Sequence, residues 1–134
     1  MKTLIFEDDF TSRLLLQTFL ARYGECHIAV NGKEAVRAFA VASENGSPYD
    51  LICMDIMLPE MDGKEALKRL RSIEEERGIF STKGAKVIMT TAATEMKDIV
   101  SSFQDLCDAY LFKPIDTGKL LEHVRTFGLL AYVT

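Results

Sequence analysis

Five short and almost wholly apolar segments constrain the fold of this chain more than any other feature of its sequence. They are TLIF (3–6), HIAV (27–30), LICMD (51–55), KVIMT (86–90) and AYLF (109–112). A strand that is apolar on both faces is typical of a parallel sheet that helices cover on both sides. Helical patterns fill the intervals, so the elements alternate between strand and helix along the whole chain.

Apolar residues recur at helical spacing between these segments, and polar capping residues precede three of the helices. The apolar stripes comprise Leu15, Leu16, Phe19, Leu20 and Tyr23; Leu67, Leu70 and Ile73; and Leu120, Leu121, Val124 and Phe127. Asn31, Asp62 and Asp116 are the expected caps. Alternation of this kind favours right-handed crossovers. The sequence therefore predicts an α/β fold, a (βα)₅ doubly wound five-stranded parallel sheet, as one domain over residues 1–134.

The composition fits a protein with a hydrophobic core and argues against several classes of partner. The 134 residues are 48% hydrophobic and carry a formal net charge of −4, with no basic block, so nucleic acid binding is not expected. No signal peptide and no membrane-spanning run is evident. Cys26, Cys53 and Cys107 are far apart and form no metal or disulfide pattern. We expect a cytoplasmic protein with reduced thiols and no membrane contact.

Polar and charged residues stand at the carboxyl ends of four predicted strands. They are Glu7, Asp8 and Asp9 after the first, Asp55 in the third, Thr90 and Thr91 in the fourth, and Lys113 and Pro114 after the fifth. In doubly wound sheets the functional crevice lies outside these ends. Three neighbouring carboxylates repel one another, and Lys113 supplies one compensating charge. The remaining formal charge of −2 and the oxygen ligands favour a divalent Mg²⁺ ion.

A carboxylate, Mg²⁺, a lysine and a hydroxyl together suit phosphoryl transfer. Asp55 can attack a phosphoryl group and carry it as an acyl phosphate. Mg²⁺, Lys113 and the Thr91 hydroxyl could each contact one phosphoryl oxygen. Each residue alone has an ordinary explanation, because acids cap helices and a lysine often precedes a surface turn. Their joint placement at the strand ends favours the chemical interpretation.

With these motifs the chain resembles the receiver domain of bacterial two-component response regulators, of the single-domain, chemotaxis type. The resemblance runs from Lys2 to about Phe127 and is carried by Glu7-Asp8, by DIMLPEMDG (55–63), by Thr91-Ala92 and by YLFKP (110–114). It implies a flavodoxin-like sheet with the strand order 2-1-3-4-5.

The resemblance also implies roles for individual residues around a phosphorylated Asp55. Asp8 and Asp55 would bind Mg²⁺ directly, Glu7 largely through water, and Met57 through its backbone carbonyl. A slip of one residue would instead make Asp9 a ligand in place of Glu7.

Three further residues complete the implied site. Lys113 would contact the phosphoryl group, and the peptide bond between Lys113 and Pro114 would be cis. Thr91 and Tyr110 would form a switch pair, in which the hydroxyl moves toward the phosphoryl group and the aromatic ring turns inward.

The implied function is a signalling switch and not an enzyme with many turnovers on an external substrate. A sensor histidine kinase, a phosphotransferase or a small phosphodonor would phosphorylate Asp55, and the domain would dephosphorylate itself. The added charge would bias the switch pair and the helix expected over about residues 95–106. A downstream protein target, or weakly a second copy, would bind the face formed by that helix, the fifth strand and the last helix.

Three alternatives are less well supported by the sequence. A Mg²⁺-dependent aspartate-nucleophile phosphatase would carry a second Asp two residues after the nucleophile, where this chain has Met57. A flavodoxin-like cofactor binder would need a loop rich in Ser, Thr and Gly after the first strand, and the loop here is EDDF (7–10). A degenerate receiver would lack one of the key residues, and all of them are present.

Overall fold

A five-stranded parallel sheet forms the centre of the computed structural model, which describes residues 1–55, 63–79, 84–92 and 107–130. The strands are β1 (Thr3–Phe6), β2 (Cys26–Ala29), β3 (Leu51–Asp55), β4 (Lys86–Ala92) and β5 (Ala109–Lys113). They lie in the order β2-β1-β3-β4-β5, and all neighbouring strands are parallel. The predicted sheet and its strand order are therefore confirmed.

The observed strands differ from the predicted ones only at their ends. β2 includes Cys26, which pairs with Thr3, and stops before Val30, which is 45% exposed. β4 continues two residues past its pairing with Asp55, as far as Ala92 beside Lys113. Thr91 therefore lies within a paired strand and not in a loop.

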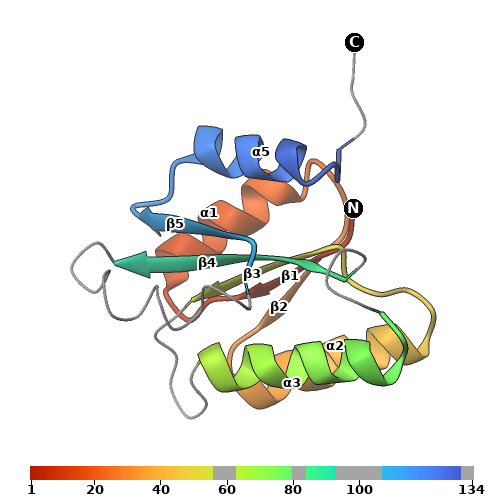
Figure 1. The fold of residues 1–134 in the computed structure, drawn as a ribbon. Helices are drawn as coiled ribbons and strands as arrows, with labels where there is room; N and C mark the ends of the chain where they lie inside the picture. Colours follow the sequence, from red (N-terminus) through yellow and green to blue (C-terminus); the bar gives the residue numbers. More distant parts are fainter. Residues whose placement is uncertain (56–62, 80–83, 93–106, 131–134) are drawn as a thin grey trace.

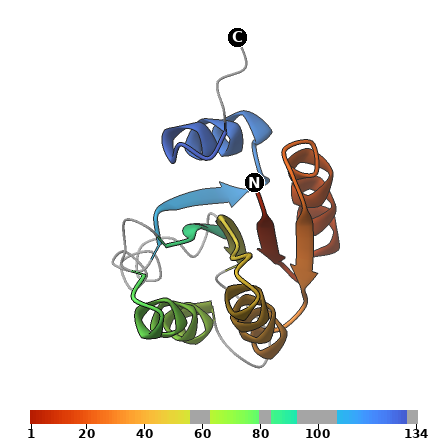
Figure 2. The same ribbon diagram turned by 90° about the vertical axis from the view of Figure 1, so that its right-hand side faces the viewer.

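Helices cover both faces of the sheet (Figures 1 and 2). Helices α1 (Phe10–Leu20) and α5 (Thr117–Thr126) lie on one face, and α2 (Gly32–Glu44) and α3 (Gly63–Glu76) lie on the other. The helix predicted over about residues 95–106, together with Met57 and Asp62, lies outside the described residues. In the part of the chain that the structure describes, none of the helices has the length and apolar character needed to span a membrane.

Two hydrophobic clusters, one on each face of the sheet, hold the layers together. Successive residues of a strand point to opposite faces. In β1, Leu4 and Phe6 pack with α2 and α3, while Ile5 packs with α1 and α5, and all three are fully buried. Burial on both faces explains why the strand segments are apolar throughout.

Side-chain caps determine where three of the helices begin. Asp9, Asn31 and Asp116 have extended backbone conformations directly before α1, α2 and α5. Their side chains accept hydrogen bonds from backbone N–H groups in the first turn, such as those of Ser12 and Glu34, which would otherwise be unpaired. The predicted caps Asn31 and Asp116 are confirmed, and among the three acids after β1 the cap is Asp9.

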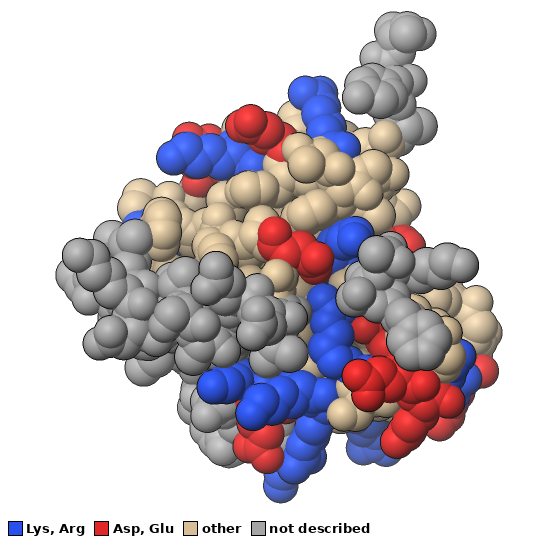
Figure 3. Space-filling model, in the orientation of Figure 1, with Lys and Arg blue, Asp and Glu red and all other residues tan. Residues whose placement is uncertain are grey.

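Charged side chains of both signs gather over α3 on the face shown in Figure 3. One of the exposed pairs on this helix joins Arg69 to Glu65 at 3.1 Å, with both side chains 54% exposed. An exposed pair one helical turn apart contributes little to stability, because water solvates both charges.

A second arginine of α3 belongs instead to a partly buried network at the amino ends of β4 and β5. Arg71 donates hydrogen bonds to Glu74 (2.7 Å), to the Ala85 carbonyl (2.9 Å) and to Asp108 (3.3 Å). Glu74 accepts from the Ala85 N–H, and Asp108 accepts from the Val87 N–H, both at 2.7 Å. The Glu74 side chain is only 6% exposed. Because little water reaches its carboxylate, these hydrogen bonds take the place of solvation.

We predict that Arg71→Met lowers the free energy of unfolding by about 2 to 4 kcal/mol, because it leaves the buried carboxylate of Glu74 without its cation. Arg69→Met is the matched control on the same helix, and we expect it to cost less than about 1 kcal/mol. Urea denaturation of both variants measures the difference. Equal losses would show that the network does not anchor α3 to the sheet.

Candidate functional site

Four polar side chains meet at the carboxyl edge of the sheet, on the face covered by α1 and α5. Glu7 follows β1, Asp55 ends β3, Thr90 lies beside Asp55 in the register of β4, and Lys113 ends β5. Residues two positions apart along a strand share a face. The residues two positions before these four all belong to the cluster that α1 and α5 cover: Ile5, Cys53, Ile88 and Leu111.

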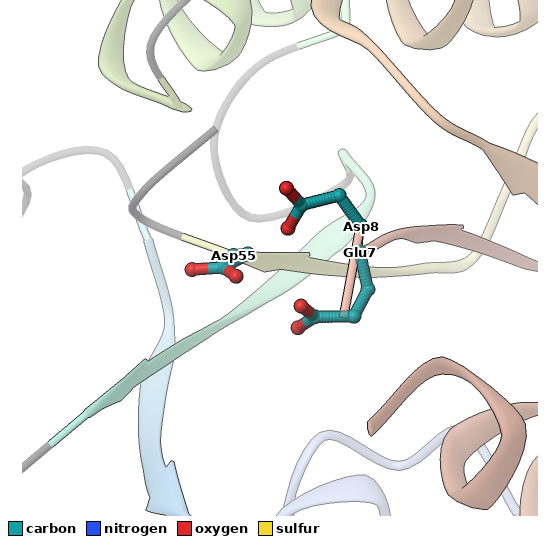
Figure 4. A group of neighbouring side chains, drawn as sticks. All are labelled: Glu7, Asp8 and Asp55. Atoms are coloured by element: carbon teal, nitrogen blue, oxygen red, sulfur yellow. The ribbon is translucent and has the colours of Figure 1, made fainter. Parts of the chain in front are cut away.

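Glu7, Asp8 and Asp55 form the acidic cluster of this edge. Figure 4 shows the carboxyl groups of Glu7 and Asp8 on opposite sides of the chain at the end of β1, both turned toward Asp55. One carboxylate oxygen from each residue lies within 4.8 Å of the others. Glu7 is 0% and Asp55 5% exposed, whereas Asp8 is exposed. The cluster is therefore reachable from solvent on the side of Asp8.

Lys113 brings a positive charge to the two buried acids. Its Nζ lies 2.9 Å from Glu7 Oε1 and 2.8 Å from Asp55 Oδ2. Burial acts to lower the pKa of the ammonium, but the hydrogen bonds to Asp55 and Glu7 outweigh it, so the pKa of Lys113 is raised. The ammonium stays charged and offsets part of the repulsion among the carboxylates.

Burial disfavours the charged form of Glu7. Burial, followed by the hydrogen bond shared with Asp55, raises the pKa of Glu7 to about 7, although Lys113 acts in the opposite direction. The cluster therefore still has an excess of negative charge with Lys113 in place. A divalent cation among these oxygens would relieve that excess.

The donor set and its spacing fit a hard cation such as Mg²⁺. Mg²⁺ binds oxygen ligands at about 2.1 Å, so two of its ligands lie at most about 4.2 Å apart. Oxygens within 4.8 Å of one another can hold such an ion after a small movement, or with water between one carboxylate and the ion. Within the described residues, Glu7, Asp8 and Asp55 are the residues that could bind it.

The carboxylate of Asp9 is turned away from this cluster and caps α1. Its carboxylate accepts hydrogen bonds from the N–H and the hydroxyl of Ser12. The Ser12 hydroxyl, followed by the backbone N–H, lowers the pKa of Asp9. The alternative in which Asp9 replaces Glu7 as a metal ligand is thus at odds with the observed arrangement.

The two residues predicted as a switch pair lie on the opposite face of the sheet. Tyr110 is half-buried and packs against the cluster under α2 and α3, and it pairs in the register with Met89. Thr91 is buried two residues after Met89 and shares its face. The structure thus places Thr91 and Tyr110 as diagonal neighbours, separated from Lys113 by the plane of the sheet. The bond between Lys113 and Pro114 is cis.

Thr90 is the site residue whose contact the sequence analysis missed. The sequence placed Thr90 only at the end of a predicted strand, and the hydroxyl expected to contact a phosphoryl oxygen was that of Thr91. The structure shows that Thr90 Oγ1 donates to Glu7 Oε2 at 3.0 Å. Alternation along β4 was the available signal, because Thr90 and not Thr91 shares the face of Ile88.

A doubly wound parallel sheet with paired acids and a lysine at its carboxyl edge defines a class of α/β signalling domain. The chain belongs to the response regulator receiver domain family, whose model matches residues 3–125. It is a receiver domain of a two-component response regulator, and its role is in signalling. The phosphatase alternative is not favoured.

Curated relatives and solved structures agree with this assignment. The transcriptional regulatory protein SrrA of Staphylococcus aureus is 35% identical over 123 residues, which are 91% of this chain and 45% of SrrA. The chain thus spans less than half the length of that relative.

Two solved structures also match. A co-crystal structure of the Saccharomyces cerevisiae histidine phosphotransfer protein Ypd1 and the receiver domain of its downstream response regulator Ssk1 has a TM-score of 0.76. The identity is 29%, over 96% of this chain and 89% of that chain. The receiver domain of the Arabidopsis thaliana histidine kinase CKI1 has a TM-score of 0.79. Its identity is 27%, over 96% of this chain and 90% of that chain.

The raised pKa of Glu7 predicts a pH dependence of stability in the absence of divalent cations. The unfolded chain releases this proton near pH 4.5 and the folded chain near pH 7, so between these values the folded state binds more protons. The free energy of unfolding therefore falls as the pH rises from about 4.5 to 7, by up to about 3 kcal/mol.

Urea denaturation of the wild type and of Glu7→Gln in chelator, across this pH range, measures the effect. We expect the wild type to lose stability relative to the variant as the pH rises. If the difference in free energy of unfolding between the wild type and Glu7→Gln stays constant with pH, the assignment of the effect to Glu7 is wrong.

Proposed function

We propose that this receiver domain accepts a phosphoryl group on Asp55 in a Mg²⁺-dependent reaction and that phosphorylation changes which protein it binds. The observation that carries the proposal is the Lys113 ammonium, which lies between Glu7 and Asp55 at the carboxyl edge of the sheet. This cation would be available to a phosphoryl group on Asp55 without any rearrangement of the strands.

The transfer step requires an aimed nucleophile and compensation of charge. β3 fixes the backbone of Asp55, and the hydrogen bond from Lys113 restricts its carboxylate. Attack by an Asp55 oxygen forms the new O–P bond, and the bond from phosphorus to the donor nitrogen or oxygen breaks. Asp8, Asp55 and the Met57 carbonyl would hold Mg²⁺ directly, and Glu7 would hold it through water. The bound ion would neutralise charge on the phosphoryl oxygens. Hydrolysis of the acyl phosphate by water would reset the domain.

The signal would then pass to the opposite face of the sheet. We propose that the Thr91 hydroxyl moves to a phosphoryl oxygen and that the Tyr110 ring turns toward the vacated space. Phe112 in β5 is 42% exposed and could anchor a protein target, or weakly a second copy, at the face formed by residues 95–106, β5 and α5. Residues 1–134 would act as one receiver domain in the cytoplasm, without contact to nucleic acid or membrane.

A second set of exposed apolar residues supports a docking site for the phosphodonor. Phe10 and Leu14 lie one turn apart on α1 and are 65% and 50% exposed, and Phe10 is two residues from Asp8. A histidine kinase or histidine phosphotransfer protein seated there would bring its phosphohistidine to the side from which the cluster is reachable. The similarity to the Ssk1 receiver domain, which was crystallised with such a protein, supports this choice of partner.

We predict that Asp55→Asn abolishes phosphorylation by a small donor such as phosphoramidate in the presence of Mg²⁺, because the amide lacks the nucleophilic oxygen. The exposed Asp50 provides a control, and Asp50→Asn should react like the wild type. Intact-mass spectrometry before and after alkaline treatment detects the labile acyl phosphate. Alkali-labile phosphate on the Asp55→Asn protein would overturn the proposed function.

We also predict that Phe10→Ser slows phosphoryl transfer from a phosphorylated histidine phosphotransfer protein by about tenfold, because an aromatic contact at the centre of an interface is lost. The rate with phosphoramidate should not change. Val41→Ser, on the exposed side of α2 where Val41 is 48% exposed, should leave both rates unchanged. Equal slowing by the two variants would exclude docking on α1.

A further inference from the structure

Thr90 is a buried hydroxyl in contact with the acidic cluster. It is 1% exposed, and its Oγ1 lies 3.0 Å from Glu7 Oε2 and 3.5 Å from the Met54 carbonyl oxygen. A hydroxyl has a single proton to donate. The shorter distance assigns that proton to Glu7.

Three donors together hold the Glu7 carboxylate. Oε1 accepts from Lys113 at 2.9 Å and from the Asp9 N–H at 3.1 Å, which uses both of its lone pairs. Oε2 accepts from Thr90 with one of its two lone pairs. Because these donors come from β4, β5 and the residue before α1, they restrict the orientation of the carboxylate, and within the described residues they occupy three of its four acceptor positions.

We propose that Thr90 is a positioning residue of the cation site, which holds the Glu7 carboxylate in the orientation in which it binds a water of a hydrated divalent cation. This inference rests on the proposed function, because it concerns the same Mg²⁺ site. Mg²⁺ gives up its waters reluctantly, so a carboxylate that fixes one of them and does not replace it suits this ion. Groups that orient the ligands of a metal typically contribute about 10- to 100-fold to its affinity.

The test is the dissociation constant for Mg²⁺ alone, measured by isothermal titration calorimetry. Thr90→Val keeps the branched shape that suits a strand but removes the donor, and we expect the constant to rise about tenfold. Thr90→Ser keeps the hydroxyl and should stay within about threefold of the wild type. If Thr90→Val does not fold, as judged by circular dichroism, Thr90→Ala replaces it.

Thr3→Val is the matched control. Thr3 is also a fully buried strand threonine, and in the described part of the chain its hydroxyl has no hydrogen-bond partner. Its replacement should leave the Mg²⁺ constant unchanged. An effect as large as that of Thr90→Val would show that loss of any buried hydroxyl weakens the site, and the proposal would fail.

A double variant tests whether Thr90 acts through Glu7. In a Glu7→Gln background, Thr90→Val should change the Mg²⁺ constant no further, whereas independent effects on binding would add. Three results would each overturn the proposal. They are additive effects of the two substitutions, a Thr90→Ser protein that binds Mg²⁺ as weakly as Thr90→Val, and a Thr90→Val protein whose dissociation constant equals that of the wild type. If the wild type itself does not bind Mg²⁺, the proposed function fails. If the wild type binds Mg²⁺ and Thr90→Val binds it equally well, only the positioning role fails.

Discussion

The ion pairs of Lys113 with Glu7 and Asp55 are the interactions on which the rest of the site depends. Two almost fully buried carboxylates repel each other, and a cation between them offsets that repulsion. Lys113 reaches them from β5, past β4, and so joins the ends of β1, β3 and β5. The same long side chain is mobile enough to follow a phosphoryl group once one is attached to Asp55.

The sheet separates the proposed chemistry from the proposed response. Glu7, Asp55 and Lys113 share the face of α1 and α5, while Thr91 and Tyr110 share the face of α2 and α3. The carboxyl edge is where both groups come close, so an added charge on Asp55 could affect both faces. The amino edge is held differently, by the partly buried network around Arg71, which links α3 to the starts of β4 and β5. The proposed switch would act at the carboxyl edge, away from this network.

Thr90 shows how a single strand position can orient a carboxylate in the acidic cluster of a receiver domain. The three carboxylates and the lysine supply the charges, but charges alone do not orient a ligand. The Thr90 hydroxyl on β4, two strands away from β1, occupies one of the four acceptor positions of Glu7, and in our proposal it thereby limits how this acid can meet a cation. The relative SrrA extends well beyond the length of this chain, so this geometry concerns the receiver domain alone.

The sequence by itself determined the elements of the fold and the residues that stand at the strand ends. Apolar runs buried on both sides, and caps such as Asn31 and Asp116, depend on residues near one another in the chain, and local patterns predict them well. Only the tertiary structure decided which acid caps α1 and which two join Asp55, and whether Thr90 or Thr91 contacts Glu7. Those choices depend on register and on the face to which each side chain points. Thr90 is 83 positions and Lys113 is 106 positions from Glu7 in the sequence. Their contacts with Glu7 form only when the strands are aligned.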